Sequence, residues 1–173
     1  MTTQPDQLAE QGKQAFKDKK FDEAAELFRQ AGEAYALSGA GLSSAEMRNN
    51  ISVALLQAGK PQESLAAALD TDQIFADAKD IKRQGMALGN QAAALEALNR
   101  YDEAVEKYDL AAQLFNQVGE GDLRAMVMKS SAAIKLKTGK VTDSAFKMMG
   151  SLDAKDNPSL FERILKFFLR FIK

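Results

Sequence analysis

"FDEAAELF" at residues 21–28 and "YDEAVEKY" at residues 101–108 follow one pattern. Each stretch begins with an aromatic residue, continues with two acids and an alanine, and ends with a second aromatic residue. Weaker copies begin at residues 61 and 141, so the four starting positions 21, 61, 101 and 141 are 40 residues apart. A fixed period of this length predicts a repeat protein.

Small residues occupy two further columns of the repeat. The first column contains Gly12, Ser52, Ala92 and Ala132, and the second contains Ala24, Ser64, Ala104 and Ser144. Small residues in two helical segments let the helix backbones approach closely, as an antiparallel pair requires. The apolar spacing is helical and does not alternate as it does in a strand. Each repeat is therefore predicted to be a helical hairpin, with Ala24, Phe28, Ala104 and Tyr108 inside it.

Turn signals separate the predicted helices. Gly59-Lys60-Pro61 combines a glycine that ends one helix with a proline that opens the next. The equivalent positions in the other repeats hold Lys19, Asn99 and Gly139. The sequence thus predicts an all-α chain with an array at residues 1–157 and a further segment at 158–173. The repeats are expected at about 6–40, 46–80, 86–120 and 126–157.

The pattern resembles the tetratricopeptide repeat family. The third copy matches best, with Ala92, Leu95, Tyr101, Ala104, Tyr108 and Ala111 in register. A period of 40 exceeds the usual value of about 34 and is similar to longer variants in kinesin light chains, Pins-type scaffolds and the soluble attachment factors of vesicle fusion. The resemblance implies a right-handed α-solenoid whose first helices line a concave groove for a peptide or helix of a partner protein.

The family register places a set of residues in that groove: Lys13, Phe16, Asn49, Asn50, Val53, Gln57, Gly89, Asn90, Ala93, Glu96, Lys129, Ser130, Ala133 and Lys137. Asn50 and Asn90 share one column, and relatives use such an asparagine to bond the main chain of the ligand. An amide suits this task because it both donates and accepts. The alternative is that the two amides bond neighbouring helices.

One column argues against a carboxylate clamp of the kind that holds the C-terminus of a ligand in some relatives. The clamp requires cations, but this column contains Asp6, Glu46, Met86 and Met126. Binding of chaperone tails is therefore not expected. Met86, Met126 and Met128 are either an adaptable contact surface or filler between helices.

Composition excludes several functions. The chain has no cysteine and no histidine, which removes the commonest catalytic base and the commonest transition-metal ligands. It has neither a glycine-rich phosphate loop nor a nucleophile elbow. Its net charge of −1 gives no general attraction to nucleic acid. We expect a non-enzymatic scaffold or adaptor without a cofactor or metal. Without a signal peptide or an apolar run of spanning length, it is expected in the cytoplasm or peripheral to a membrane.

The segment "NPSLFERILKFFLRFIK" at residues 157–173 has a different character. Its apolar residues cover an arc of about 200° at about 100° per residue. From residue 158 on it has four cations and one acid, so it carries +3 and the rest of the chain −4. This amphipathic pattern fits a helix that caps the array, binds an anionic membrane, or contacts a second copy or another protein. The residues for such contacts are Phe161, Ile164, Leu165, Phe168, Phe171 and Ile172.

Overall fold

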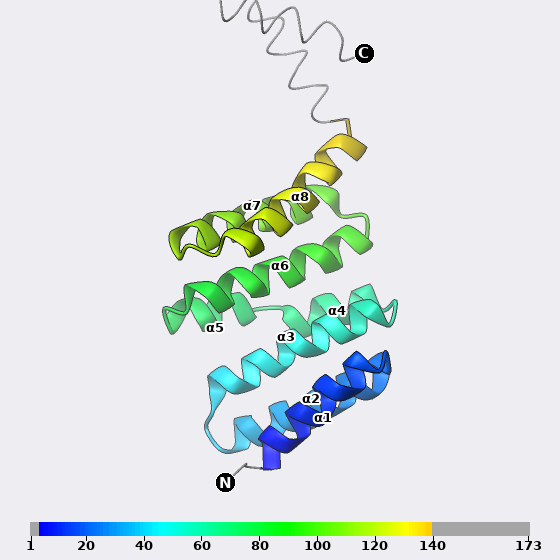
Figure 1. Cartoon of the computed structure of the whole chain (residues 1–173), viewed down its shortest axis with the longest axis vertical. Coiled ribbons are helices and arrows are strands. Elements are labelled where there is room, and N and C mark those ends of the chain that lie inside the picture. Colours follow the sequence, from blue (N-terminus) through cyan, green and yellow to red (C-terminus); the bar gives the residue numbers. More distant parts are fainter. Residues whose placement is uncertain (1–3, 140–173) are drawn as a thin grey trace, which may run out of the picture. The chain divides into compact units, whose positions relative to one another are not determined.

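The structure is a computed structural model that describes residues 4–139, and all regular elements in this range are α-helices. They are α1 (Gln4–Lys17), α2 (Phe21–Leu37), α3 (Gly41–Gln57), α4 (Pro61–Ala68), α5 (Thr71–Asp77), α6 (Ile81–Ala97), α7 (Tyr101–Gln117) and α8 (Gly121–Lys137) (Figure 1). The chain divides into two compact units, Met1–Ser131 and Ala132–Lys173. The predicted boundary at 157/158 and the segment 158–173 lie outside the described residues.

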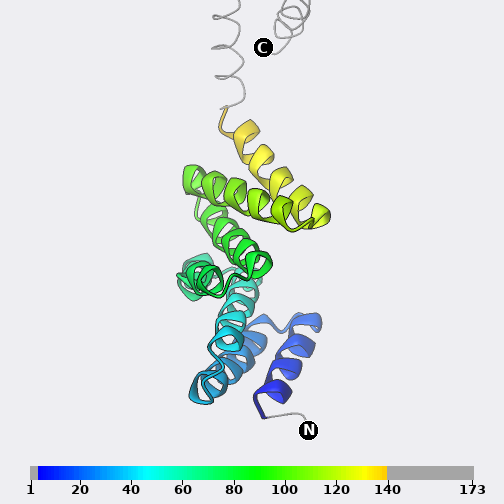
Figure 2. The ribbon, with the colours of Figure 1, turned by 90° about the vertical axis from the view of Figure 1, so that its left-hand side faces the viewer.

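The helix boundaries follow the predicted period. Helices begin at residues 21, 61 and 101 and again at 41, 81 and 121, so each series advances by 40. The helices α2, α3, α6, α7 and α8 are all 17 residues long. In the first unit, α1 packs on α2, α3 on α4 and α6 on α7, and these neighbours lie side by side in both views (Figure 2). The first three predicted hairpins are therefore present, and the second helix of the fourth lies outside the described residues.

Each turn between helices ends the preceding helix in the same way. Residues 19, 39, 59, 79, 99, 119 and 139 all have positive φ, one in every 20 residues. After α6, for example, Asn99 N donates to Glu96 O and Arg100 N donates to Leu95 O, both at 2.9 Å. This pair of bonds is a Schellman motif, which satisfies the last carbonyls of the helix and requires a left-handed residue. Glycine at position 59 adopts that conformation without a steric penalty.

The small-residue columns lie where two helices of a hairpin approach closely. A Cβ atom on Gly12 would lie 2.8 Å from Cδ1 of the Phe28 ring, so a side chain at this position would require the ring to move. In the second hairpin, Ser52 and Ser64 meet with their Oγ atoms 3.0 Å apart. The residues predicted inside the hairpins are indeed buried: Ala24, Phe28, Ala104 and Tyr108. Their burial confirms the register.

The second hairpin differs from the prediction because its second helix is broken. Leu69 is extended, with φ −57° and ψ 136°, and Asp70 is left-handed, with φ 61°. The break separates α4 from α5 and is visible as coil between them in Figure 1. Where the first and third hairpins have the Phe28 and Tyr108 rings, the second has Ala68.

Polar side chains form hydrogen bonds with the backbone at this break. Gln91 Nε2 on α6 donates to Ala68 O at 2.8 Å and to Asp72 Oδ1 at 2.7 Å. Thr71 Oγ1 lies 2.8 Å from Ala68 O and from Asn49 Oδ1. On α3, the guanidinium of Arg48 donates to the carbonyls of residues 67 and 69. Carbonyls that lose their helical partners are thus bonded by side chains of α3, α5 and α6, which offsets the cost of burying them.

Candidate functional site

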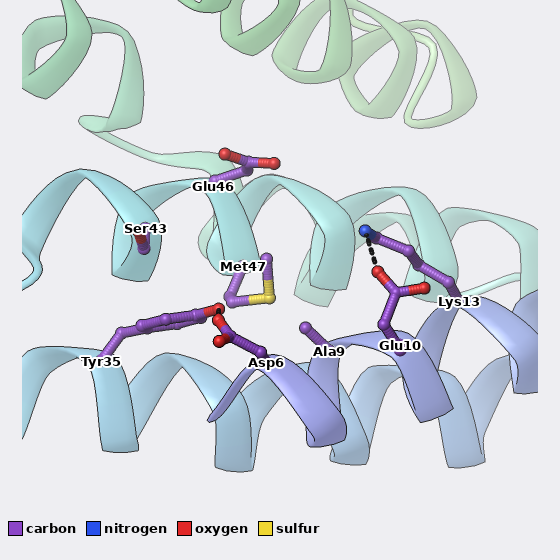
Figure 3. A pocket seen from close by; sticks show the side chains of 8 residues that line it. All are labelled: Asp6, Ala9, Glu10, Lys13, Tyr35, Ser43, Glu46 and Met47. Atoms are coloured by element: carbon purple, nitrogen blue, oxygen red, sulfur yellow. Dashed lines mark hydrogen bonds and ion pairs between the residues drawn. The ribbon is translucent and has the colours of Figure 1, made fainter. Parts of the chain in front are cut away.

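Two adjoining pockets lie along α1 and α3. The first, which we call the acidic pocket, has a volume of about 530 Å³ (Figure 3). It is lined by Asp6, Ala9, Glu10, Lys13, Tyr35, Ser43, Glu46 and Met47. The second, the apolar pocket, has a volume of about 310 Å³ and is lined by Lys13, Phe16, Lys17, Phe28, Glu46, Asn50 and Val53. Both pockets include Lys13 and Glu46 and therefore adjoin, and we refer to the two together as the α1–α3 groove.

Carboxylates dominate the acidic pocket. Tyr35 Oη donates to Asp6 Oδ1 at 2.5 Å, and this bond, together with burial and the charges of Asp6, Glu46 and Glu10, raises the pKa of Tyr35 to about 12. Lys13 Nζ lies 2.7 Å from Glu10 Oε1. The three acids outnumber the single lysine of the lining, so the pocket favours cations.

A third pocket, the α6–α8 pocket, lies in the later part of the first unit. It has a volume of about 260 Å³ and is lined by Met86, Gly89, Asn90, Ala93, Tyr108, Phe115, Leu123, Met126, Val127 and Ser130. None of these lining side chains carries a formal charge at neutral pH. Tyr108 Oη donates to Glu96 Oε2 at 3.0 Å, and burial followed by the nearby Glu96 carboxylate raises the pKa of this phenol.

The α1–α3 groove and the α6–α8 pocket use equivalent positions of the repeat. The two sites are related by 80 residues, so that Asn50 on α3 has Ser130 on α8 as its counterpart, whereas Asn90 shares the column of Asn50 but lines its pocket from the earlier helix α6. An aromatic ring of the second helix contributes to each, namely Phe28 in one and Tyr108 in the other. The sequence analysis predicted these rings only as core residues. Their recurrence seven positions after the start of the repeat was the signal that could have placed them in the pockets as well.

The structure distributes the predicted groove residues among different surroundings. Lys13, Asn50 and Val53 meet in the apolar pocket, and Asn90 and Ser130 meet in the α6–α8 pocket. Asn49 is buried against Thr71 and belongs to the polar cluster at the helix break. The remaining predicted residues of the first unit, Gln57, Glu96 and Lys129, lie at or near the surface, and Lys137 is an exposed residue of the second unit.

The two predicted amides differ from Asn49 in their bonding. Among the residues that the structure describes, the side chains of Asn50 and Asn90 have no hydrogen-bond partner, and both are partly exposed. An amide held only for structure normally bonds a neighbouring helix, as Asn49 does with Thr71. The bonding capacity of Asn50 and Asn90 is therefore available to a ligand.

The acidic pocket was not predicted from the sequence. Asp6 and Glu46 entered the sequence analysis only as residues that break a carboxylate clamp. Their meeting with Glu10 and Tyr35 in one pocket depends on how α1, α2 and α3 pack, and a single column of the repeat does not reveal it.

No protein-family model matches the chain, and no curated protein matches it in sequence. In the range 4–139, no helix is long and apolar enough to cross a membrane, and no group of three or more metal-ligating side chains occurs. The predicted contact residues of the C-terminal segment, which run from Phe161 to Ile172, lie outside this range.

Proposed function

We propose that the chain is a tetratricopeptide-like right-handed solenoid of four hairpins that acts as a non-enzymatic scaffold. It binds a peptide or helix of a partner protein along its first helices. The hairpin pairing, the period of 40 residues and the small-residue columns support this fold. The fourth hairpin and an amphipathic helix at residues 158–173 are part of the proposal on their sequence pattern alone.

The observation that carries the function is the matched pair of amides. Asn50 and Asn90 occupy one column of the repeat, and each lines a pocket together with an aromatic ring. Neither side chain is used by another described residue. An amide can donate to and accept from the main chain of a ligand whatever side chains that ligand carries, while the ring provides apolar contact area.

Selection of binders from a displayed peptide library on the full chain tests the proposal. Changing Asn50 and Asn90 together to alanine should weaken the selected binders about tenfold or more, because each net hydrogen bond contributes about 0.5–1.5 kcal/mol. The melting temperature should stay the same, since neither amide bonds another described residue.

The control variant changes Gln62 and Gln113, two exposed amides on α4 and α7, to alanine and should bind normally. If the asparagine variant loses stability and keeps its affinity, the amides are structural and the proposed function is wrong.

A further inference from the structure

The α1–α3 groove and the α6–α8 pocket differ in charge at three columns of the repeat, and the largest difference is at the column of Asp6. This column places Asp6 and Glu46 in the acidic pocket, and it places Met86 and Met126 in the α6–α8 pocket. Glu10 adds a third carboxylate to the first site. Glu10 and Glu46 lie in the second turn of α1 and α3, beyond the first turn where a helix dipole favours an acid. The helix dipole therefore does not account for these two acids.

The α1–α3 groove has two chemically distinct ends. The acidic pocket involves the N-terminal halves of α1 and α3, and the apolar pocket involves their C-terminal halves. The distance along α1 from Asp6 to Phe16 is about 15 Å, which about ten residues of a second helix would cover. A ligand that fills both pockets must carry two different groups within a few helical turns.

The charges of the acidic end are only partly balanced within the protein. Lys13 pairs with Glu10, and the guanidinium of Arg83 is divided between Glu46 at 3.2 Å and Asp80 at 2.6 Å. Two cations thus serve the three carboxylates of Glu10, Glu46 and Asp80. The side chains of Glu10 and Glu46 keep 69% and 46% of their exposure. Each of the two carboxylates is therefore accessible to an incoming cation.

We propose that the α1–α3 groove binds an amphipathic helical segment of a partner protein that places a lysine or arginine in the acidic pocket and a large apolar side chain in the apolar pocket. The α6–α8 pocket takes an apolar side chain without a cation. The proposal rests on the proposed scaffold function and specifies the chemistry of the partner.

The lining of the acidic pocket suits the whole of a basic side chain. Ala9, Met47 and the ring of Tyr35 provide apolar surface for the aliphatic stem of lysine or arginine, and Glu10 and Glu46 accept hydrogen bonds from its charged end. In the adjoining pocket, Phe16, Phe28 and Val53 surround the apolar anchor. Asn50 lies beside that anchor and can bond the backbone of the partner.

The test uses the full chain and two synthetic amphipathic helical peptides. They differ in one residue, lysine or glutamine, placed one helical turn from a central phenylalanine. Binding is followed by calorimetry and by the amide NMR shifts of Asn50 and Val53, with Asn90 and Ala93 as reporters of the other pocket. The protein variants are Glu10→Gln with Glu46→Gln, and a control with Glu63→Gln and Glu106→Gln, which changes exposed carboxylates of α4 and α7.

The lysine peptide should shift Asn50 and Val53 and bind the first variant about fivefold more weakly, as expected for two exposed ion pairs. The glutamine peptide should not distinguish the proteins, and the control should bind like the unaltered chain. Higher salt should reduce the advantage of lysine. A second variant, Glu46→Met with Met86→Glu, should move the preference for lysine to the α6–α8 pocket.

Equal losses for both peptides would overturn the proposal, since the carboxylates would then not recognise the cation. Shifts confined to Asn90 and Ala93 would also overturn it while leaving the proposed function intact. Binding at neither pocket would count against both proposals. Melting temperatures of all variants identify any that lose their fold, and the exchange variant then provides the independent readout.

Discussion

The second and third hairpins fill the space between their two helices in different ways. The third has two uninterrupted helices, α6 and α7, with the ring of Tyr108 between them. The second has Ala68 at that position, a broken second helix, and a cluster of buried polar groups around the break. The same position of the repeat therefore tolerates either a large ring or a small residue with a broken helix, provided that side chains donate to the backbone carbonyls at the break.

The largest expected effect concerns the small column of the third hairpin. Ala104 is completely buried, so replacing it with tryptophan should lower the free energy of unfolding by about 3 kcal/mol through overpacking. Urea denaturation measures the change. Ala97→Trp, on the exposed end of α6, is the matched control and should cost little. A tolerated tryptophan at position 104 would contradict the packing described for this hairpin.

The polar cluster of the second hairpin provides the next prediction. Gln91→Leu removes the donor to Ala68 O and to Asp72 Oδ1, and because Thr71 Oγ1 can still donate to Ala68 O, the lost bonds should cost about 1 kcal/mol. Gln113→Leu, on the exposed side of α7, controls for the change in residue type. Unchanged stability of the Gln91 variant in thermal unfolding would mean that the break does not depend on this donor.

A smaller gain in stability is expected at the left-handed residue of the break. Asp70 has φ 61°, a conformation that glycine adopts without strain, so Asp70→Gly should stabilise the chain by about 0.5–1 kcal/mol. Asn99→Gly, at φ 59° in the ordinary turn between α6 and α7, should give a similar or smaller gain. Differential scanning calorimetry of both variants compares the two sites. Destabilisation by glycine at position 70 would show that the aspartate side chain holds the break.

The smallest effect should appear only in alkali. The pKa of Tyr108 is raised above its ordinary value of 10.0 by burial and by Glu96, so folding favours the neutral phenol. This contribution is complete below pH 10 and is lost as the pH rises further, because the unfolded chain releases the proton first. Tyr108→Phe should therefore lose less stability than the unaltered chain above pH 10. Tyr101→Phe serves as the control, and identical alkaline profiles for all three would refute the prediction.

Much of the fold was predictable because small residues recur with the same period as the helices. Gly12, Ser52 and Ala92 are small where an aromatic ring or a serine approaches, and this requirement appears directly in the sequence. The broken helix was not predictable from the same columns. Ala68 is a good helix former, and the break depends on donors from Arg48 and Gln91, which are 19 and 23 residues away in sequence from the carbonyls of Ala67 and Ala68 that they bond.

The candidate site was predictable only in part. Asn50 and Asn90 were predicted as groove residues because the same residue type recurs at the same position of two repeats. Asn49, the neighbour of Asn50, was assigned to the groove although it bonds Thr71 inside the second hairpin. The acidic pocket was missed because the sequence analysis considered the column of Asn50 and Asn90 only for its amides, although Glu10 occupies the same column in the first repeat. Only the meeting of three helices brings Glu10 and Tyr35 into one pocket.

The reach of Gln91 into the preceding hairpin has a consequence for the order of assembly. In the third hairpin, α6 and α7 pack on each other and are adjacent in the sequence, so this hairpin can form from contacts that are local in the chain. The second hairpin cannot complete the bonding of Ala68 O until α6 is in place, because the amide that donates to that carbonyl belongs to α6. The hydrogen bonds around the break between α4 and α5 are therefore expected to form late in folding. During synthesis from the N-terminus, α3 and α4 must wait for about twenty further residues before their backbone is fully bonded.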